Sequence, residues 1–284
     1  MRTLMLSLLA LSLAACDDGG EDTSPVDSDG DGVLDHDEQS NGTDPDLPDT
    51  DGDGLTDGEE LDHGTDGTLA DTDGDGYSDF DEITVGKDPL DATSRIYFGG
   101  WPYNPAKGTI VGLDWTEGLD EGEVIYHFSG TDQFGEVVDL YDFAGHGKYV
   151  AVDLSAGWCY YCQEVAKWLD GQASMWDKYV DHYGWEAVPQ AINDGTVYWV
   201  TILDQNRMGG PASESTVSVW YDDFPNPAIP VLADTEQVMA THLQIYGYPS
   251  ILLLDETMTV VNYDIMDYTA VFNAIASIAQ TGAP

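Results

Sequence analysis

The pattern of apolar and polar positions divides the chain into three regions. Residues 4–13 form a short apolar run, residues 17–91 are polar and acidic, and residues 120–280 contain apolar segments with strand and helix spacing. In the last region the run Y-V-A-V-D-L, residues 149–154, predicts a buried strand. A helix is predicted after it, because apolar side chains recur at helical intervals: Val165, Trp168, Leu169 and Trp176.

Strands and helices alternate along the rest of this region. The further predicted strands are residues 198–203, 251–254 and 260–263, with a short strand or loop near residue 230. The further predicted helices are residues 213–224, 236–243 and 268–280. This alternation predicts an α/β sandwich around a mixed sheet. The 284 residues suffice for one such core and a smaller module.

Two cysteines follow the strand at residues 149–154. The spacing W-C-Y-Y-C places Cys159 at a helix start, where free N–H groups and the helix dipole lower a thiol pKa. Cys162 lies one turn later, within reach of a mixed disulfide on Cys159. Asp153 in the strand interior is unfavourable unless it is protonated, paired or functional, and a structural role stays open. An inert disulfide or half of a zinc site are the alternatives for the cysteines, although zinc needs four ligands.

Three segments carry a family resemblance. V-D-L-S-A-G-W-C-Y-Y-C, residues 152–162, resembles the active-site strand and turn of thioredoxins. Residues 134–152 resemble the N-terminal hairpin and G-K-x-V strand of the redoxin branch, and Y-G-Y-P-S-I-L-L-L, residues 246–254, resembles its cis-proline strand. The resemblance spans roughly residues 120–280 and implies a thioredoxin-like fold, with a mixed sheet flanked by helices.

The resemblance also implies a role for each site residue. Cys159 would be the attacking thiol, Cys162 the resolving thiol, and Asp153 a proton relay for Cys162. Trp158 would shield the site, and Pro249, if cis, would present its backbone to an extended substrate. The implied activity is thiol–disulfide exchange without an organic cofactor. Its partners would be protein thiols or disulfides and a redox donor or acceptor protein.

Some residues depart from the family pattern. Tyr160 and Tyr161 stand between the cysteines and Tyr248 precedes the proline, so neither redox potential nor substrate follows from the resemblance. A redoxin-type thiol peroxidase is a second hypothesis, although Ala156 stands where peroxidases usually have threonine. A calcium-dependent surface or adhesion protein with a non-catalytic redoxin scaffold is a third.

Charge is distributed unevenly along the chain. The formal net charge is −46, which excludes nucleic-acid binding through phosphate contacts and electrostatic attachment to anionic lipid. Of the 54 acidic residues, 28 lie between Asp17 and Asp91, which marks a separate module.

This module contains three similar segments that start at Asp27, Asp49 and Asp71, 22 residues apart. Each fits D-x-D-x-D-G-x-x-D-x-x-E, the calcium-loop pattern with oxygen ligands at positions 1, 3, 5, 7, 9 and 12. Position 7 offers a backbone carbonyl and position 9 can act through water. The predicted calcium ligands are Asp27, Asp29, Asp31, Val33, Asp35, Glu38, Asp49, Asp51, Asp53, Leu55, Asp57, Glu60, Asp71, Asp73, Asp75, Tyr77, Asp79 and Glu82.

Only ten residues separate successive loops, so paired EF-hands are excluded. The repeats resemble bacterial thrombospondin type 3 repeats, with G-T-D-P at residues 42–45 matching their turn. A dockerin would need apolar recognition helices, which the sequence lacks. Without calcium, a disordered acidic tether is the alternative. With calcium, the repeats would form a stiff spacer, and weak extracellular-type sites suit an exported protein.

The N-terminal sequence predicts export and a lipid anchor. Arg2 precedes an apolar run that is too short to span a bilayer, and L-A-A-C resembles a bacterial lipobox with Cys16 as the acylated residue. An ordinary signal peptide is the alternative. We therefore expect a lipid-anchored protein of the bacterial cell envelope, outside the cytoplasm. The expected segments are a signal peptide (1–15), a linker (16–26), calcium repeats (27–94), a lead-in (95–119) and the redoxin domain (120–284).

Overall fold

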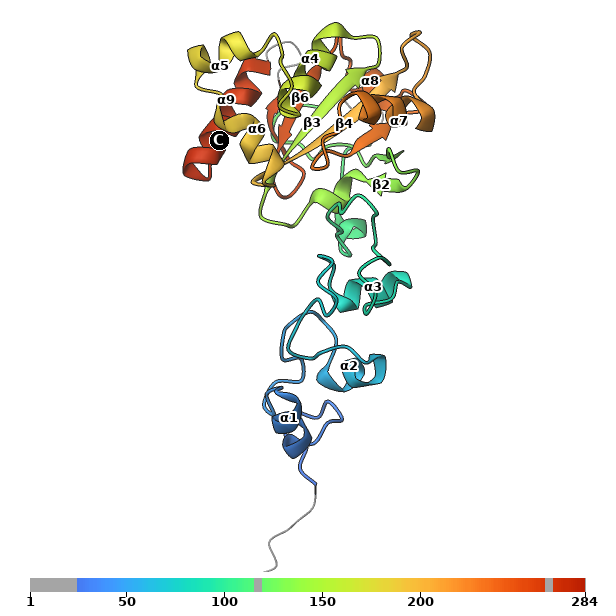
Figure 1. Ribbon diagram of the computed structural model, residues 1–284, viewed down its shortest axis with the longest axis vertical. Coiled ribbons are helices and arrows are strands. Elements are labelled where there is room, and N and C mark those ends of the chain that lie inside the picture. Colours follow the sequence, from blue (N-terminus) through green and yellow to red (C-terminus); the bar gives the residue numbers. More distant parts are fainter. Residues whose placement is uncertain (1–24, 115–118, 264–267, 284) are drawn as a thin grey trace, which may run out of the picture. The chain divides into compact units, whose positions relative to one another are not determined.

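The computed structural model describes residues 25–114, 119–263 and 268–283 (Figure 1). The chain forms two compact units, residues 1–70 and residues 71–284. The first unit carries the first two acidic repeats. The second unit carries the third repeat together with the α/β domain, so this repeat belongs structurally to the domain that holds the cysteines.

Each acidic repeat is a loop followed by a short helix. The three helices are α1 (Asp35–Asn41), α2 (Asp57–His63) and α3 (Asp79–Val85). Each helix is followed by a glycine with positive φ, because the left-handed C-terminal position favours a residue without Cβ. At seven residues the helices are too short to form paired EF-hands, as the spacing predicted.

The α/β domain follows a lead-in that contains the 3-10 helix η1 (Lys107–Thr109). Its strands are β1 (Ser129–Thr131), β2 (Val137–Asp139), β3 (Tyr149–Ala156), β4 (Val197–Gln205), β5 (Val231–Ala233), β6 (Ser250–Leu254) and β7 (Val260–Tyr263). Its helices are η2 (Leu140–Phe143), α4 (Tyr160–Leu169), α5 (Asp177–Tyr183), α6 (Ala187–Asn193), α7 (Glu214–Asp223), α8 (Val238–His242) and α9 (Tyr268–Thr281).

The strands form one mixed sheet in the order β2-β1-β5-β4-β3-β6-β7. β3, β4 and β5 are parallel, whereas β6 pairs antiparallel with β3 and with β7. β3 lies between β4 and β6, and all of its residues after Tyr149 are buried. This central strand leads directly to the cysteine pair, which is the arrangement of a thioredoxin-like fold.

The two faces of the sheet pack against different elements, because side chains alternate along each strand. Ala151, Trp199 and Leu253 face a core shared with α4, α6, α7 and α9. Val152, Val200 and Leu252 face a second core shared with η2, α8 and the aromatic residues of the lead-in. The first core contains an aromatic cluster around Trp185, which is 1% exposed.

The structure confirms the predicted α/β fold class. The α/β domain also contains two α-helices that the sequence pattern did not predict, α5 and α6. The helix α4 ends at Leu169, so Trp176, which the pattern placed at a helical interval, lies outside it. No residue of α5 is fully buried, so its apolar pattern is weak, although Tyr179 and Val180 pack against the first core. α6 contains Pro189, and a proline usually indicates the end of a helix in a sequence pattern. Pro189 is tolerated here because it lies in the first helical turn.

Candidate functional site

The cysteine pair lies at the start of α4. Cys159 is the N-cap residue of this helix, and it forms a disulfide with Cys162, with a Cα–Cα distance of 5.3 Å. The Cys162 N–H donates a hydrogen bond to Cys159 Sγ over 3.2 Å. Because this N–H of the first turn points at the sulfur, it would stabilise a thiolate there after reduction.

Asp153 is a buried acid on the strand that leads to the cysteines. Its side chain accepts hydrogen bonds from Ser155 Oγ at 2.8 Å and Thr201 Oγ1 at 3.4 Å. Burial raises the pKa of Asp153 to about 7, and these two hydroxyl groups only partly oppose the rise. A carboxyl group with this pKa can hold or release a proton near neutral pH, as a proton relay requires.

The loop before β6 meets the loop before α4. The Tyr248–Pro249 peptide bond is cis, and β6 begins at the next residue. The rings of Trp158 and Tyr248 lie edge to face, with centroids 5.8 Å apart. The Trp158 indole N–H also donates to Gln205 Oε1 at 2.8 Å, so β4 holds this ring in place. The sequence-predicted residues Trp158 and Pro249 thus come from two loops that are in contact.

The surface around the disulfide is aromatic. Trp158, Tyr160 and Tyr161 are each at least half exposed, whereas Cys159 is 3% exposed and Cys162 is buried. Beside Trp158 and Tyr248 lies a pocket of about 430 Å³. The buried Asp204 lines this pocket and accepts a hydrogen bond from the Tyr248 hydroxyl. Asp204 was not predicted as a site residue, because the predicted strand of residues 198–203 ends before it, whereas β4 continues to Gln205.

The three acidic loops share one geometry. In each loop a backbone N–H of position 4 donates to the position 1 aspartate, as from Gly30 to Asp27 over 2.7 Å. The N–H of position 7 donates to the position 5 aspartate, as from Val33 to Asp31 over 2.7 Å. These bonds bring oxygens of positions 1, 3 and 5 within 4.8 Å of one another in all three loops.

The position 12 glutamates are buried beside these oxygens. Glu38 and Glu82 are 0% exposed, and neither oxygen of either residue has a hydrogen-bond partner. Burial, followed by the nearby carboxylates, raises the pKa of Glu60 and of Glu82 to about 8. Buried acids without donors are unfavourable unless a cation compensates them. Carboxylate oxygens at this spacing fit a hard divalent cation such as Ca²⁺.

The position 9 aspartates have a different environment. Asp35 accepts hydrogen bonds from the backbone and hydroxyl of Ser28 at 2.9 and 2.8 Å, and Asp57 and Asp79 accept the same bonds from position 2 threonines. Asp57 also places an oxygen within 4.8 Å of oxygens of Asp31 and Glu38 in the first loop. One repeat therefore contributes a candidate ligand to its neighbour, which the loop pattern did not predict.

Comparisons with known proteins agree with this organisation. Residues 27–45, 49–66 and 71–92 match the bacterial TSP3 repeat family. Comparison with curated proteins gave no significant match. The three acidic segments therefore match bacterial thrombospondin type 3 repeats, as the sequence resemblance predicted.

Solved structures similar to the chain include a thioredoxin domain of a thiol-disulfide oxidoreductase from Bacteroides vulgatus. It is 20% identical, with a TM-score of 0.40, and the match covers 57% of this chain and 99% of that one. A thiol:disulfide interchange protein from Bacteroides sp. is 20% identical, with a TM-score of 0.40 and coverage of 57% and 91%. The exposed lipoprotein thioredoxin of Streptococcus pneumoniae is 22% identical, with a TM-score of 0.37 and coverage of 53% and 98%.

The predicted lipidation site, Cys16, lies outside the described residues. In the described ranges from residue 25 onward, no helix has the length and apolar character needed to cross a membrane.

Proposed function

We propose that this protein is an extracytoplasmic, lipid-anchored thiol–disulfide oxidoreductase with calcium-binding repeats. The observation that carries the proposal is the Cys159–Cys162 disulfide at the start of α4, in contact with the loop of cis-Pro249 through Trp158 and Tyr248. Exposed aromatic side chains around a nearly buried sulfur suit a protein substrate, because they offer apolar contact area without closing the site.

In the reductive direction, the Cys159 thiolate attacks one sulfur of a substrate disulfide. A mixed disulfide forms and the other substrate sulfur leaves as a thiolate. The Cys162 thiolate then attacks Cys159 Sγ, which restores the disulfide and releases the second substrate thiol. Two electrons pass to the substrate, and a redox donor protein must reduce the pair again. The same steps in reverse oxidise a substrate dithiol.

Asp153 supports the second step by accepting the proton of Cys162, for which a pKa near 7 is suitable. Trp158 covers one side of the sulfur pair, and the backbone beside Pro249 binds the extended substrate chain. No organic cofactor is needed for this exchange.

The repeats would bind calcium through the aspartates of positions 1, 3 and 5 and the glutamate of position 12. Bound calcium would neutralise these buried acids and fix the loops. The buried oxygens of Glu38 and Glu82 that lack hydrogen-bond partners support this assignment. Isothermal titration of the full chain with CaCl₂ should show binding that Asp29→Asn and Asp73→Asn each reduce. An absence of binding heat at millimolar CaCl₂ would end the calcium assignment.

A lipid on Cys16 would attach the protein to a bacterial membrane. Expression of the full precursor in a bacterial host should give a membrane-bound protein. The Cys16→Ser variant should appear in the soluble fraction instead. Equal membrane binding of both proteins would contradict the anchor.

The redox activity is tested by insulin reduction with dithiothreitol as donor. Cys159→Ser should reduce the rate to that of the uncatalysed reaction, because the attacking thiol is lost. Cys162→Ser should form trapped mixed disulfides that mass spectrometry detects. Cys16→Ser is the matched control, since it also removes one thiol but should keep the wild-type rate. Equal rates for wild type and Cys159→Ser would refute the proposed activity.

A further inference from the structure

The 22-residue period does not end with the third acidic repeat. One period after Asp71 stands Thr93, and residues 93–104 read T-S-R-I-Y-F-G-G-W-P-Y-N. Position 2 is Ser94, a hydroxyl residue as in all three acidic repeats. The acids are gone, however: positions 3, 5 and 9 are Arg95, Tyr97 and Trp101. We call residues 93–104 the fourth repeat.

Backbone geometry supports this register. In the second repeat the Asp44 N–H donates to Thr50 Oγ1 over 2.9 Å, and at the equivalent place the Asp88 N–H donates to Ser94 Oγ over 3.0 Å. The turns that precede Thr50 and Ser94 also contain equivalent hydrogen bonds. The Asp46 N–H donates to Asp44 Oδ1 over 3.2 Å, and the Leu90 N–H donates to Asp88 Oδ1 over 3.1 Å. The chain therefore enters the fourth repeat as it enters the second.

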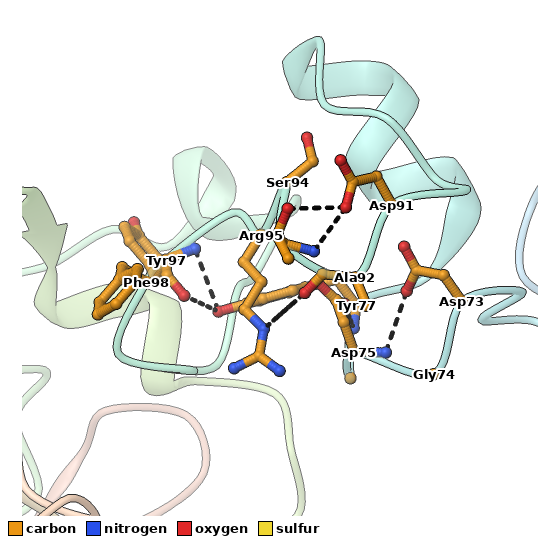
Figure 2. Close-up of polar contacts among 12 residues, drawn as sticks. Asp73, Gly74, Asp75, Tyr77, Asp91, Ala92, Ser94, Arg95, Tyr97 and Phe98 are labelled. Carbon is orange, nitrogen blue, oxygen red and sulfur yellow. Dashed lines mark hydrogen bonds and ion pairs between the residues drawn. The ribbon is translucent and has the colours of Figure 1, made fainter.

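The third loop is joined to the fourth repeat by its position 7 residue. The Tyr77 hydroxyl donates to the Trp101 carbonyl over 2.7 Å and accepts from the Tyr97 N–H over 3.2 Å. Figure 2 shows Tyr77 reaching the Tyr97 backbone, with Arg95 beside Asp75. Arg95 Nε lies 3.7 Å from Asp75 Oδ2. The backbone N–H of Tyr77 also donates to the side chain of Asp75. Tyr77 therefore contacts a candidate metal ligand through its backbone and the lead-in through its hydroxyl.

The fourth repeat is in turn bonded to the thioredoxin-like domain. The Tyr97 hydroxyl donates over 2.6 Å to Asp142 in η2, an acid that is fully buried and also paired with Lys107 Nζ at 2.7 Å. The Trp101 indole N–H donates over 2.8 Å to Asp132, which follows β1 and accepts two N–H groups of the β1–β2 turn. At positions 5 and 9, where the acidic repeats have aspartates, the fourth repeat therefore has aromatic residues that contact the domain.

We propose that residues 93–104 are a fourth, metal-free repeat that couples the third calcium loop to the thioredoxin-like domain. Calcium bound at the third loop then stabilises the domain that carries Cys159 and Cys162. This inference rests on the proposed calcium binding but not on the redox activity. Calcium at the first loop, in the other compact unit, has no such effect on the domain.

Tryptophan fluorescence provides a selective measurement, because all eight tryptophans lie after residue 100. Thermal unfolding of the full oxidised chain is followed in EDTA and in CaCl₂ at about 100 times the dissociation constant. One coupled site then raises the ratio of folded to unfolded protein about 100-fold. For a unit of this size, that corresponds to a rise in melting temperature of roughly 5 to 10 °C.

Three variants locate the coupling. Asp73→Asn/Glu82→Gln should abolish the calcium-dependent shift, whereas the matched pair Asp29→Asn/Glu38→Gln in the first loop should keep it. Tyr77→Phe should reduce the shift, because the ring remains but the bonds to the fourth repeat are lost.

Hydrogen exchange of the wild-type protein gives a second readout that does not depend on the folding of a variant. Calcium should slow exchange in residues 93–104 and in η2. Calcium binding without a shift of the tryptophan transition, or a shift that survives in Asp73→Asn/Glu82→Gln, would overturn the coupling. An absence of calcium binding would overturn both the coupling and the calcium assignment, while insulin reduction would still test the redox activity separately.

Discussion

The buried acid in β3, Asp153, makes stability depend on pH in a predictable direction. Asp153 is 2% exposed, and burial raises its pKa from 3.8 to about 7. The native protein therefore keeps this proton at pH values where the unfolded chain has already lost it. The native state binds more protons between about pH 4 and 7, so stability falls as the pH rises through this interval.

Replacing Asp153 by asparagine removes the titration while nearly preserving the shape of the side chain. The pKa rise corresponds to about 4 kcal/mol, since a tenfold change in an equilibrium constant is about 1.4 kcal/mol. Asp153→Asn should therefore gain up to about 4 kcal/mol relative to wild type between pH 4 and pH 8. The assay is urea unfolding of both oxidised proteins at several pH values. The difference between the unfolding free energies of the two proteins removes the contribution of the other titrating groups. A difference that does not change with pH would refute the reasoning.

Further substitutions test individual contacts of the domain by urea unfolding. Trp185→Ala removes a buried ring that packs against Trp168 and Phe272, and should lower the free energy of unfolding by about 3–5 kcal/mol. Met208→Ala, at a 93% exposed side chain, should change it by less than about 0.5 kcal/mol. Glu164→Gln weakens the contacts of this buried acid with Lys167 and the Met175 N–H, and should cost about 1–3 kcal/mol.

The elements around the cysteine pair could be predicted from the sequence because each of them is local. The strand before Cys159, the helix after it and the strand after Pro249 each have a clear apolar pattern, and β7 has the predicted bounds of residues 260–263. The loop pattern likewise grouped the acids of positions 1, 3 and 5, because backbone N–H groups within each loop hold them.

Other features could not be predicted because they depend on contacts between distant segments. Asp204 contacts the Tyr248 hydroxyl, 44 residues further along the chain. Asp57 reaches the first loop because the second repeat packs against the first, which a pattern for a single loop does not contain. The fourth repeat has lost the acids that define the motif. Its period becomes recognisable only when Ser94 is seen in the position of Thr50.

The coupling of the third loop to the domain changes the interpretation of the repeats. A spacer of three equal loops would act only as a stiff tether. In this structure the position 7 side chains Val33 and Leu55 are apolar, whereas Tyr77 adds a hydroxyl that bonds to the lead-in. The third repeat is therefore part of the structural support of the domain.

The most direct test of the central claim is a redox titration of the Cys159–Cys162 pair. The Cys16→Ser protein is equilibrated in thiol–disulfide buffers of known potential, and the two remaining thiols are counted by alkylation and mass spectrometry. An exchange site should be reduced and reoxidised reversibly in one two-electron step, with a midpoint above about −300 mV. A pair that stays oxidised down to lower potentials and does not exchange with the buffer would be a structural disulfide, which would contradict the account.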